Sequence, residues 1–207
     1  MIYQSFKDIH KDSKIIITGL GESAQALGDL VDSVHAIDCL TMGVNDVGRL
    51  FTPDYTVVVN DKASFNEHRW KHIESCRSKA LFTHIKDPMM IPVTHQDRVV
   101  TIPLGRYAGT DLNKIAVDFT SNSPYVACVI AAYMGVKHIG LIGVDWTPNH
   151  FFAKTGDHPL SKKIHSIVTE YNNLALALQA KGISFHNLSP VSKLGIPRMH
   201  LNDFLNL

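Results

Sequence analysis

The sequence lacks a strong excess of either charge, a paired cysteine spacing and a long apolar run. Its 207 residues include 20 Lys and Arg against 19 Asp and Glu, and no basic cluster. A formal net charge of +1 argues against a nucleic-acid scaffold that depends mainly on phosphate contacts. The longest apolar stretches are only as long as a strand. We therefore expect no nucleic-acid partner and no membrane span.

Cysteine is also scarce, and the three that occur match no metal-ligand or redox motif. Cys39, Cys76 and Cys128 lie far apart in the chain. The first eight residues form neither a basic nor an apolar segment of a signal peptide. An odd number of cysteines without a signal predicts reduced thiols. We expect a soluble cytoplasmic protein.

Apolar runs and helical patterns alternate along the chain, which predicts an α/β protein. At 45% hydrophobic residues the chain can bury one good core, so we expect a single domain over residues 1–207. The alternation favours a Rossmann-like three-layer fold with a mostly parallel sheet. The expected strands are 14–18, 34–38, 55–59, 80–85, 99–102, 137–144 and 183–187. The expected helices are 23–31, 64–78, 125–134 and 162–181, with a mobile loop over 105–120.

A glycine-rich turn follows the first strand. In Gly19-x-Gly21-x-x-Ala24 the turn opens a helix, so backbone N–H groups and the helix dipole can receive a phosphate. Asp38, at the end of the expected strand 34–38, is a candidate for binding a ribose. The alternative is a tight strand-to-helix turn with no ligand.

Two further polar segments stand beside expected helix starts. Asn45 follows a short apolar segment, and its amide can donate to and accept from a base or sugar. Its alternative role is to cap a short helix that runs toward Leu50. Ser121, Asn122 and Ser123 precede the helix at Pro124, where they suit an anion or a sugar hydroxyl, or simple capping.

The last third of the chain gathers titratable groups after a buried strand. The strand 137–144 delivers Asp145, and the loop after it holds His150, Asp157 and His158, with His165 beyond. Ligands bind at the carboxyl ends of strands in open α/β sheets. One option is a metal site, although the spacing matches no tight signature. A second option is a histidine general base. Individually, most of these histidines are also consistent with a solvated loop.

Taken in order, the motifs resemble a known group of enzymes. They are Gly-x-Gly-x-Ser at 19–23, Gly-Val-Asn at 43–45, Pro-Asp-Tyr at 53–55, Ile-x-Leu-x-Gly-x-Asp at 139–145 and Ser-Pro-x-Ser at 189–192. This order is similar to that of the bacterial lipooligosaccharide sialyltransferases. It is similar also to the wider domain-of-unknown-function 115 group, which includes pterin diphosphokinase-like enzymes. The resemblance covers roughly residues 14–195.

The resemblance implies a Rossmann-like sheet that binds a cytidine-monophosphate sugar without a required metal. It implies that the turn 19–23 lies near the nucleotide phosphate and that Asn45 and Ser123 hold the donor. The family's general base begins the penultimate helix. Its distance from the Ser-Pro-x-Ser motif places it on His165, ahead of His158.

The sequence departs from the family at two places. Leu20 stands where the family carries Asn, and no tyrosine occurs near Thr147 or over residues 150–152. A protonated His150 is our hypothesis for a replacement of the tyrosines. A nucleotide-linked donor of some kind is therefore the prediction. The predicted donor-binding residues are Gly19, Gly21, Ser23, Asn45, Asp61, Ser121, Ser123, Asp145, Thr147 and His150.

The leading hypothesis is a metal-independent transferase that moves a sugar from a nucleotide sugar to an acceptor hydroxyl. One alternative is a pterin-type diphosphokinase, with ATP and Mg²⁺ held by Asp61, Asp145 or Asp157. Others are an NAD(P)-dependent oxidoreductase and a non-catalytic nucleotide- or sugar-binding relative. The apolar tail, residues 201–207, is expected to pack on a neighbouring copy or on its own sheet, which leaves a homo-oligomer open.

Overall fold

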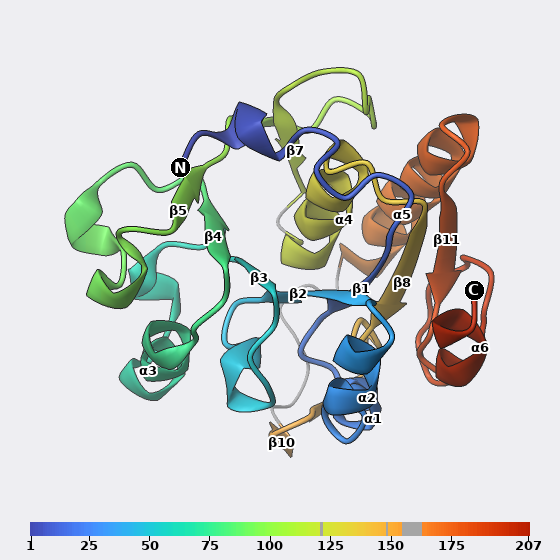
Figure 1. The fold of residues 1–207 in the computed structure, drawn as a ribbon, viewed down its shortest axis with the longest axis horizontal. Helices are drawn as coiled ribbons and strands as arrows, with labels where there is room; N and C mark the ends of the chain where they lie inside the picture. Colours follow the sequence, from blue (N-terminus) through green and yellow to red (C-terminus); the bar gives the residue numbers. More distant parts are fainter. Residues whose placement is uncertain (121, 148, 155–162) are drawn as a thin grey trace.

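The computed structural model describes residues 1–120, 122–147, 149–154 and 163–207. Its centre is a seven-stranded sheet in the order β11-β8-β1-β2-β3-β4-β5, with every neighbouring pair parallel (Figure 1). The strands are β1 Lys14–Thr18, β2 Leu40–Val44, β3 Tyr55–Val57, β4 Ala80–Thr83, β5 Val99–Thr101, β8 His138–Ile142 and β11 Ser184–Asn187. The strand order reverses between β1 and β8, because β2 to β5 extend to one side of β1 while β8 and β11 lie on the other.

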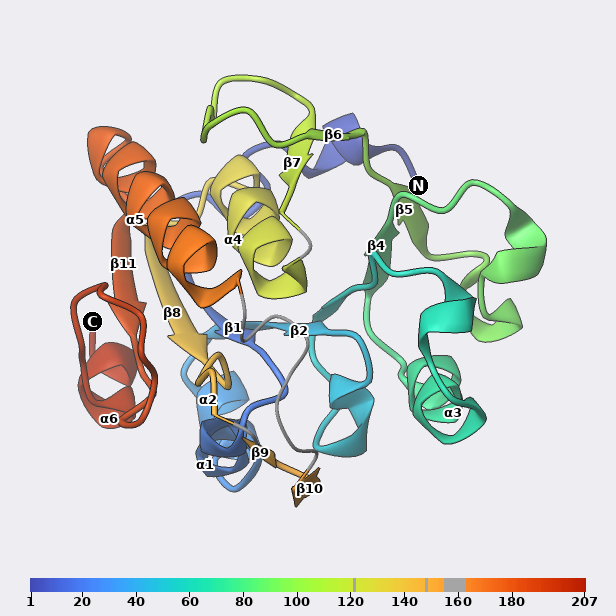
Figure 2. The ribbon, with the colours of Figure 1, turned by 180° about the vertical axis from the view of Figure 1, so that it is seen from behind.

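Helices cover both faces of the sheet, as the predicted three-layer fold requires (Figures 1 and 2). The α-helices are α1 Gln25–Gly28, α2 Val31–Ala36, α3 Glu67–Ser75, α4 Ser123–Tyr133, α5 Ile164–Ala180 and α6 Leu201–Leu205. The 3-10 helices are η1 Tyr3–Phe6, η2 Glu22–Ala24, η3 Val47–Arg49, η4 Lys62–Ser64, η5 Pro88–Met90 and η6 Val93–His95. Two small sheets pair β6 Leu104–Arg106 with β7 Val117–Phe119, and β9 Asn149–His150 with β10 Ala153–Lys154.

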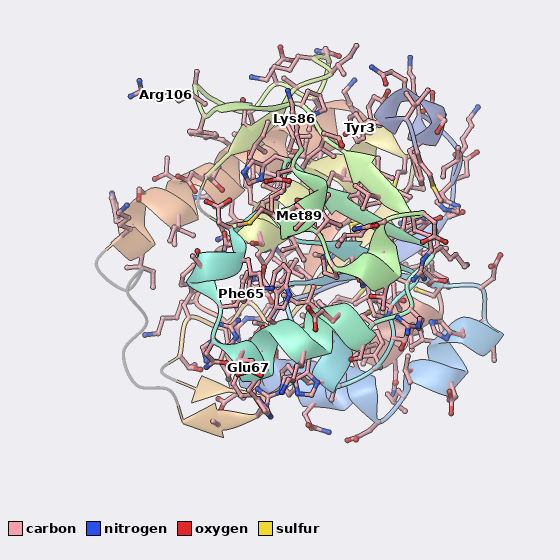
Figure 3. The ribbon with its side chains drawn as sticks, turned by 90° about the vertical axis from the view of Figure 1, so that its left-hand side faces the viewer. Tyr3, Phe65, Glu67, Lys86, Met89 and Arg106 are labelled. Carbon is pink, nitrogen blue, oxygen red and sulfur yellow. The ribbon has the colours of Figure 1, made fainter. Side chains whose placement is uncertain are left out.

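Alternate residues of β1 enter different cores. Ile15 and Ile17 face the core that α4 and α5 cover, whereas Ile16 packs in a second core with Leu27 and Val34 from α1 and α2. A third cluster lies under α3 and includes Phe65, which Figure 3 shows near the start of that helix. Since both faces of the central strands are covered, their runs are apolar throughout. No helix in the described part of the chain is both long and apolar enough to cross a bilayer.

The structure differs from the predicted elements in four places. Residues 34–38, predicted as a strand, lie mostly in helix α2, which buries Val34 in the same core as Leu27 of α1. The predicted helix 23–31 is divided into η2, α1 and the start of α2. The predicted loop 105–120 begins and ends in the paired strands β6 and β7. Residues 40–44, predicted only as a short apolar segment, form strand β2. The predicted strand 14–18 is present with the same ends, and the remaining predicted strands are present with shifted ends.

The apolar tail packs on its own chain. Phe204 of α6 is fully buried in the core that contains Ile16 and Leu188. The Lys14 ammonium donates a hydrogen bond to the carbonyl of Leu205. The sequence left open whether the tail packs on its own sheet or on a neighbouring copy. In this chain it packs on its own sheet.

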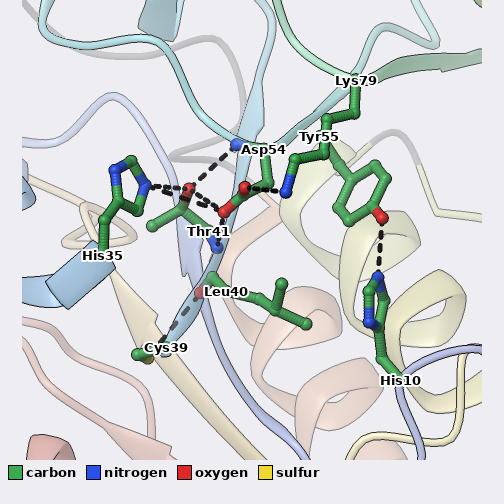
Figure 4. A network of polar contacts seen from close by, with 8 residues as sticks. All are labelled: His10, His35, Cys39, Leu40, Thr41, Asp54, Tyr55 and Lys79. Carbon is green, nitrogen blue, oxygen red and sulfur yellow. Dashed lines mark hydrogen bonds and ion pairs between the residues drawn. The ribbon is translucent and has the colours of Figure 1, made fainter. Parts of the chain in front are cut away.

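At the amino edge of the sheet, buried and partly exposed polar groups bond to one another (Figure 4). The Asp54 carboxylate accepts hydrogen bonds from the Thr41 amide at 2.9 Å and the Thr41 hydroxyl at 3.0 Å. Lys79 forms an ion pair with it at 2.8 Å, and the His35 imidazole lies 3.7 Å away. Beside this group, the Tyr55 hydroxyl and the His10 ring share a hydrogen bond of 2.6 Å. This network joins β2, β3 and the N-terminal segment.

Candidate active site at the carboxyl edge of the sheet

The turns that follow β1 and β8 pack directly against each other at the point where the strand order reverses. Gly19 donates to the Ile142 carbonyl at 2.8 Å, and Gly21 donates to the Gly143 carbonyl at 2.7 Å. A Cβ atom on Gly19 would lie 2.3 Å from the Gly143 oxygen, and Gly143 has a left-handed φ of +71°. Both glycines are therefore required for this close contact. Open α/β sheets bind ligands at such a reversal.

Asp145 ties the two turns together. Its carboxylate accepts from the Ser23 amide at 2.8 Å and from the Ser23 hydroxyl at 2.6 Å. The Ser23 oxygen in turn accepts from the Gly143 amide at 2.9 Å. The amides of Gly19, Gly21 and Ser23 thus have partners inside the protein. This corrects the predicted phosphate cradle, since these three N–H groups are not open donors.

A cleft opens beside these turns, and several predicted donor-binding residues line it. Gly21, Asn45, Ser123, Asp145, Thr147 and His150 are all on its walls. Asn60, Asn122 and Trp146 line it too. The cleft therefore brings together residues from the loops after β1, β2, β3 and β8 with the start of α4.

Asn45 offers the cleft a polar atom without a protein partner. Its backbone has a left-handed φ of +52°, a conformation that Asn tolerates better than most residues. Its Oδ1 is buried and has no hydrogen-bond partner among the residues described. Asp46, rather than Asn45, stands at the N-cap of η3, and no side chain caps that helix. The alternative role of Asn45 as a cap is wrong.

Asn122, at the start of α4, also lines the cleft and has a buried polar atom without a described partner. It is the N-cap residue, yet its side chain does not cap the helix. Its Oδ1 accepts a hydrogen bond from the Tyr171 hydroxyl at 3.2 Å. Its buried Nδ2 has no partner within the described ranges. The two residues line the same cleft, and between them they hold one acceptor and one donor without a partner among the described residues.

The segment around β9 closes the cleft next to the glycine turn. Gly21 and His150 form an antiparallel bridge, and the Phe151 amide donates to the Leu20 carbonyl at 3.0 Å. The His150 ring stacks on Phe152, with centroids 5.2 Å apart and planes inclined by 20°. Figures 1 and 2 agree that the β9–β10 hairpin lies next to α1. His150 is thus held over the turn that contains Leu20.

Other predicted residues are not in the cleft or cannot be placed. Asp61 is exposed at the N-cap of η4, and its neighbour Asn60 lines the cleft instead. Asp38 is exposed and precedes β2, so it lies at the amino edge, where it cannot meet a ribose bound in the cleft. His165 is exposed in the first turn of α5. Ser121, Asp157 and His158 lie outside the described residues.

Sequence reasoning missed Asn60 and the charges behind Asn45. Asn60 follows a predicted strand just as Asp145 does, and that position could have identified it. Asp46 is fully buried and accepts two hydrogen bonds of 3.0 Å from Arg69, and Arg49 lies 3.9 Å from it. Among the described residues, no group of three or more His, Cys, Asp or Glu side chains could hold a metal ion.

The Ser-Pro-x-Ser motif has a structural role beside the cleft. The Ser189 hydroxyl accepts hydrogen bonds from the amides of Val191 and Ser192, which closes a tight turn after β11. The Ser192 hydroxyl then donates to the Val144 carbonyl at 2.7 Å. This bond fixes the backbone just before Asp145, so the motif supports the cleft from behind.

The fold and cleft define a Rossmann-like α/β protein, and comparisons with solved structures agree. No protein-family model matches the chain, and no curated protein matches its sequence. The sialyltransferase CstII from Campylobacter jejuni, in complex with the substrate analogue cytidine-5′-monophosphate, superposes with a TM-score of 0.57 at 17% identity. This match covers 91% of this chain and 85% of the other. CstII with a trisaccharide acceptor and CMP gives 0.52 at 14% identity, over 90% and 86% of the two chains.

A second glycosyltransferase has the same fold. The MAf glycosyltransferase from Magnetospirillum magneticum AMB-1 gives a TM-score of 0.60 at 11% identity, and the match covers 95% of this chain but 37% of the other. At these identities the likeness establishes the fold. It confirms, at the level of fold, the resemblance to sialyltransferases that the motifs indicated.

Proposed function

We propose that this protein is a glycosyltransferase-like enzyme that transfers a sugar from a nucleotide-activated donor to an acceptor hydroxyl. The observation that carries the proposal is the pair of buried, unpartnered amide atoms on Asn45 and Asn122, two residues that line one cleft. Buried polar atoms nearly always have partners, because leaving one unpaired costs about 1–3 kcal/mol. A ligand that bonds to both removes that cost. The fold shared with a CMP-bound sialyltransferase favours a nucleotide sugar as that ligand.

In this proposal the cleft residues have separate roles toward the donor. Asn45, Asn60 and Asn122 bond to the nucleoside and sugar, with Ser123 beside them, and Ser121 stays a predicted donor-binding residue. Thr147 and His150 lie toward the phosphate, where the related enzymes are expected to carry tyrosines. Asp145, held by Ser23, keeps the two glycine turns and hence the cleft walls in place.

The transfer itself requires a base but no resident metal in this scheme. The acceptor oxygen forms a bond to the anomeric carbon as the bond from that carbon to the phosphate oxygen breaks, and the acceptor proton passes to a histidine. We assign this role to His165, because α5 joins β8 to the parallel β11 and so begins at the carboxyl edge. His158 is the second choice. A positioned base contributes typically about 10²–10⁴-fold to the rate.

Ligand binding tests the donor class. Thermal unfolding would be measured with CMP, CMP-sialic acid, UDP sugars and ATP, each with and without Mg²⁺. A ligand at a hundred times its dissociation constant stabilises the folded state by about 2.7 kcal/mol. We expect stabilisation by CMP compounds or another nucleotide sugar without metal. Stabilisation by ATP only with Mg²⁺ would instead indicate the diphosphokinase, and no response to any nucleotide would reject the proposal.

Turnover tests the base. With the donor identified, His165→Ala should lower kcat by about 10²–10⁴-fold while the affinity for CMP is retained. His200→Ala is the matched control, because His200 is also exposed beside a helix start, that of α6. Equal turnover in the two variants would remove His165 from the mechanism. Tight binding without turnover in the wild type would indicate a non-catalytic relative.

A further inference from the structure

The cleft has little positive charge of its own. Among its described lining residues there is no Lys or Arg, and Asp145 contributes a carboxylate. A nucleotide donor brings a phosphate, and transfer leaves further negative charge on the leaving nucleotide. Charge of that kind is stabilised by fixed cations or donors near the phosphate. The cationic side chains around the cleft are therefore candidates for this role.

Arg49 belongs to a charge cluster that has one cation in excess. The Asp46 side chain is 0% exposed, and among the described residues its carboxylate accepts three hydrogen bonds from Arg69, of which the two from Nε measure 3.0 Å. Arg49 is farther from the same carboxylate, at 3.9 Å, and its side chain is 18% exposed. One carboxylate thus faces two guanidinium groups. The cluster carries a net positive charge in a poorly solvated place, where it is weakly screened.

A stack of planar groups connects this charge to the cleft. The Arg49 guanidinium carbon lies 3.9 Å from the centroid of the Phe152 ring, within the range of a cation–π contact. Phe152 also stacks nearly parallel on His150 at 5.2 Å and meets Phe151 edge-on at 5.1 Å. His150 lines the cleft and is bridged to Gly21. The order is therefore Asp46, Arg49, Phe152, His150 and then the cleft.

We propose that Arg49 is a positioning residue of the cleft, which holds His150 in place through Phe152 and supplies the positive charge that favours the donor's phosphate. This inference rests on the proposed nucleotide-sugar donor. Its two parts are separable, because stacking requires a planar group and the field requires only a charge. Arg49→Lys keeps the charge without the flat guanidinium, and Arg49→Gln removes the charge. Phe152→Leu breaks the stack and leaves Arg49 in place.

Calorimetric titration with CMP and with cytidine tests the charge. We expect Arg49→Gln to weaken CMP binding about tenfold, because it removes one positive charge behind the cleft, and to leave cytidine binding unchanged. Arg49→Lys should retain more CMP affinity than Arg49→Gln. Lys62→Gln is the matched control, because Lys62 also stands over an aromatic ring, that of Trp70 at 5.3 Å, and does not line the cleft. It should bind both ligands like the wild type.

The position of His150 is tested without any ligand. In a histidine-labelled protein, the ring proton signals of His150 carry the ring-current shift of Phe152. We expect Phe152→Leu and Arg49→Gln to move these signals and Lys62→Gln to leave them in place. Unmoved His150 signals in both variants would overturn the positioning role. Equal losses of CMP and cytidine affinity in Arg49→Gln would overturn the charge role.

Failure of the proposed function looks different from failure of this inference. A wild type that binds neither CMP nor another nucleotide rejects the donor, and the His150 signals then still decide the positioning role. A wild type that binds CMP, with Arg49→Gln binding it equally well, rejects the charge role alone. Because Asp46 keeps its hydrogen bonds from Arg69, we expect Arg49→Gln to fold, and its unfolding temperature provides the check.

Discussion

Strands β2 and β3 have buried polar groups near both of their ends, and the two ends differ in how those groups are satisfied. At the amino edge, Asp54 bonds to Thr41 and Lys79. At the carboxyl edge, Asn45 after β2 and Asn122 at the start of α4 line one cleft, and each has a buried amide atom with no partner among the described residues. Since an unpaired buried group opposes folding, the closed network contributes to stability, and the open one is arranged for a ligand. The amino edge of the sheet therefore contributes to stability, and the carboxyl edge is arranged for binding.

The largest effect should come from breaking the closed edge. Asp54→Ala removes the acceptor for the amide and hydroxyl of Thr41 and the partner of Lys79, so the free energy of unfolding should fall by about 3 kcal/mol. Urea unfolding followed by circular dichroism measures this loss. Affinity for CMP at 25 °C should be unchanged.

An exposed ion pair provides the control for that experiment. Asp97 lies 3.4 Å from Arg98 with its side chain 80% exposed, so Asp97→Ala should change the free energy of unfolding by less than about 1 kcal/mol. If Asp54→Ala and Asp97→Ala were equally mild, the amino edge would not have the stabilising role that we assign to it.

At the carboxyl edge we expect the opposite pattern, in which ligand affinity falls and stability is nearly unchanged, and the change in free energy should be smaller. Asn45→Gly keeps the left-handed backbone at φ +52° and removes the amide. CMP affinity should fall about tenfold, which corresponds to about 1.4 kcal/mol, because a hydrogen bond to the ligand is lost. The free energy of unfolding without ligand should stay within about 1 kcal/mol. Calorimetry and urea unfolding on the same variant measure both; a large loss of stability with intact affinity would reverse the comparison.

The smallest effect is the acid dependence of the closed edge. Burial raises the pKa of Asp54, but hydrogen bonds from Lys79 and Thr41 outweigh it and hold that pKa below its ordinary value. A depressed carboxyl pKa gives stability that is present above about pH 4 and is lost as the pH falls through the folded-state value. The wild type should therefore lose stability between about pH 5 and pH 3. Urea titrations at several pH values should show this loss reduced in Asp54→Asn.

His10 should make the free energy of unfolding depend on pH in a second, higher pH range. Burial, followed by the nearby Lys79 charge, lowers the pKa of His10 below its ordinary value. Its contribution is then present above about pH 6.5 and is lost as the pH falls through the lowered pKa, because the unfolded state binds the proton more readily. His10→Gln should flatten the stability profile near pH 6 and leave the Asp54 window intact.

The sheet could be predicted from the sequence because buried parallel strands are continuous apolar runs. Residues 14–18 and 137–144 show this directly. Residues 34–38 were mistaken for a strand because a short segment with Val34 and Ile37 has no clear period of its own. Only the packing of Val34 beside Leu27 reveals that the segment is helical. Short segments are decided by their tertiary neighbours.

The candidate site was predictable where a residue follows a strand and not where distant residues meet. Asn45 and Asp145 could be picked out because each comes just after an apolar run. The bond between Ser23 and Asp145 joins residues 122 positions apart, and no local pattern indicates it. The contact of Arg49 with Phe152 is equally non-local. Hence the predicted phosphate cradle was wrong, and the charge behind the cleft was missed.

The contact between Gly19 and Gly143 has a consequence for tracing the ancestry of this chain. A side chain at Gly19 would collide with the Gly143 oxygen, and one at Gly143 would lie 2.7 Å from the Gly19 oxygen. Neither position can accept a larger residue while the other turn stays in place. Substitutions there would have to arise together with a shift of both loops. Homologues of this chain should therefore keep the two glycines as a pair, even where their overall identity to it is low.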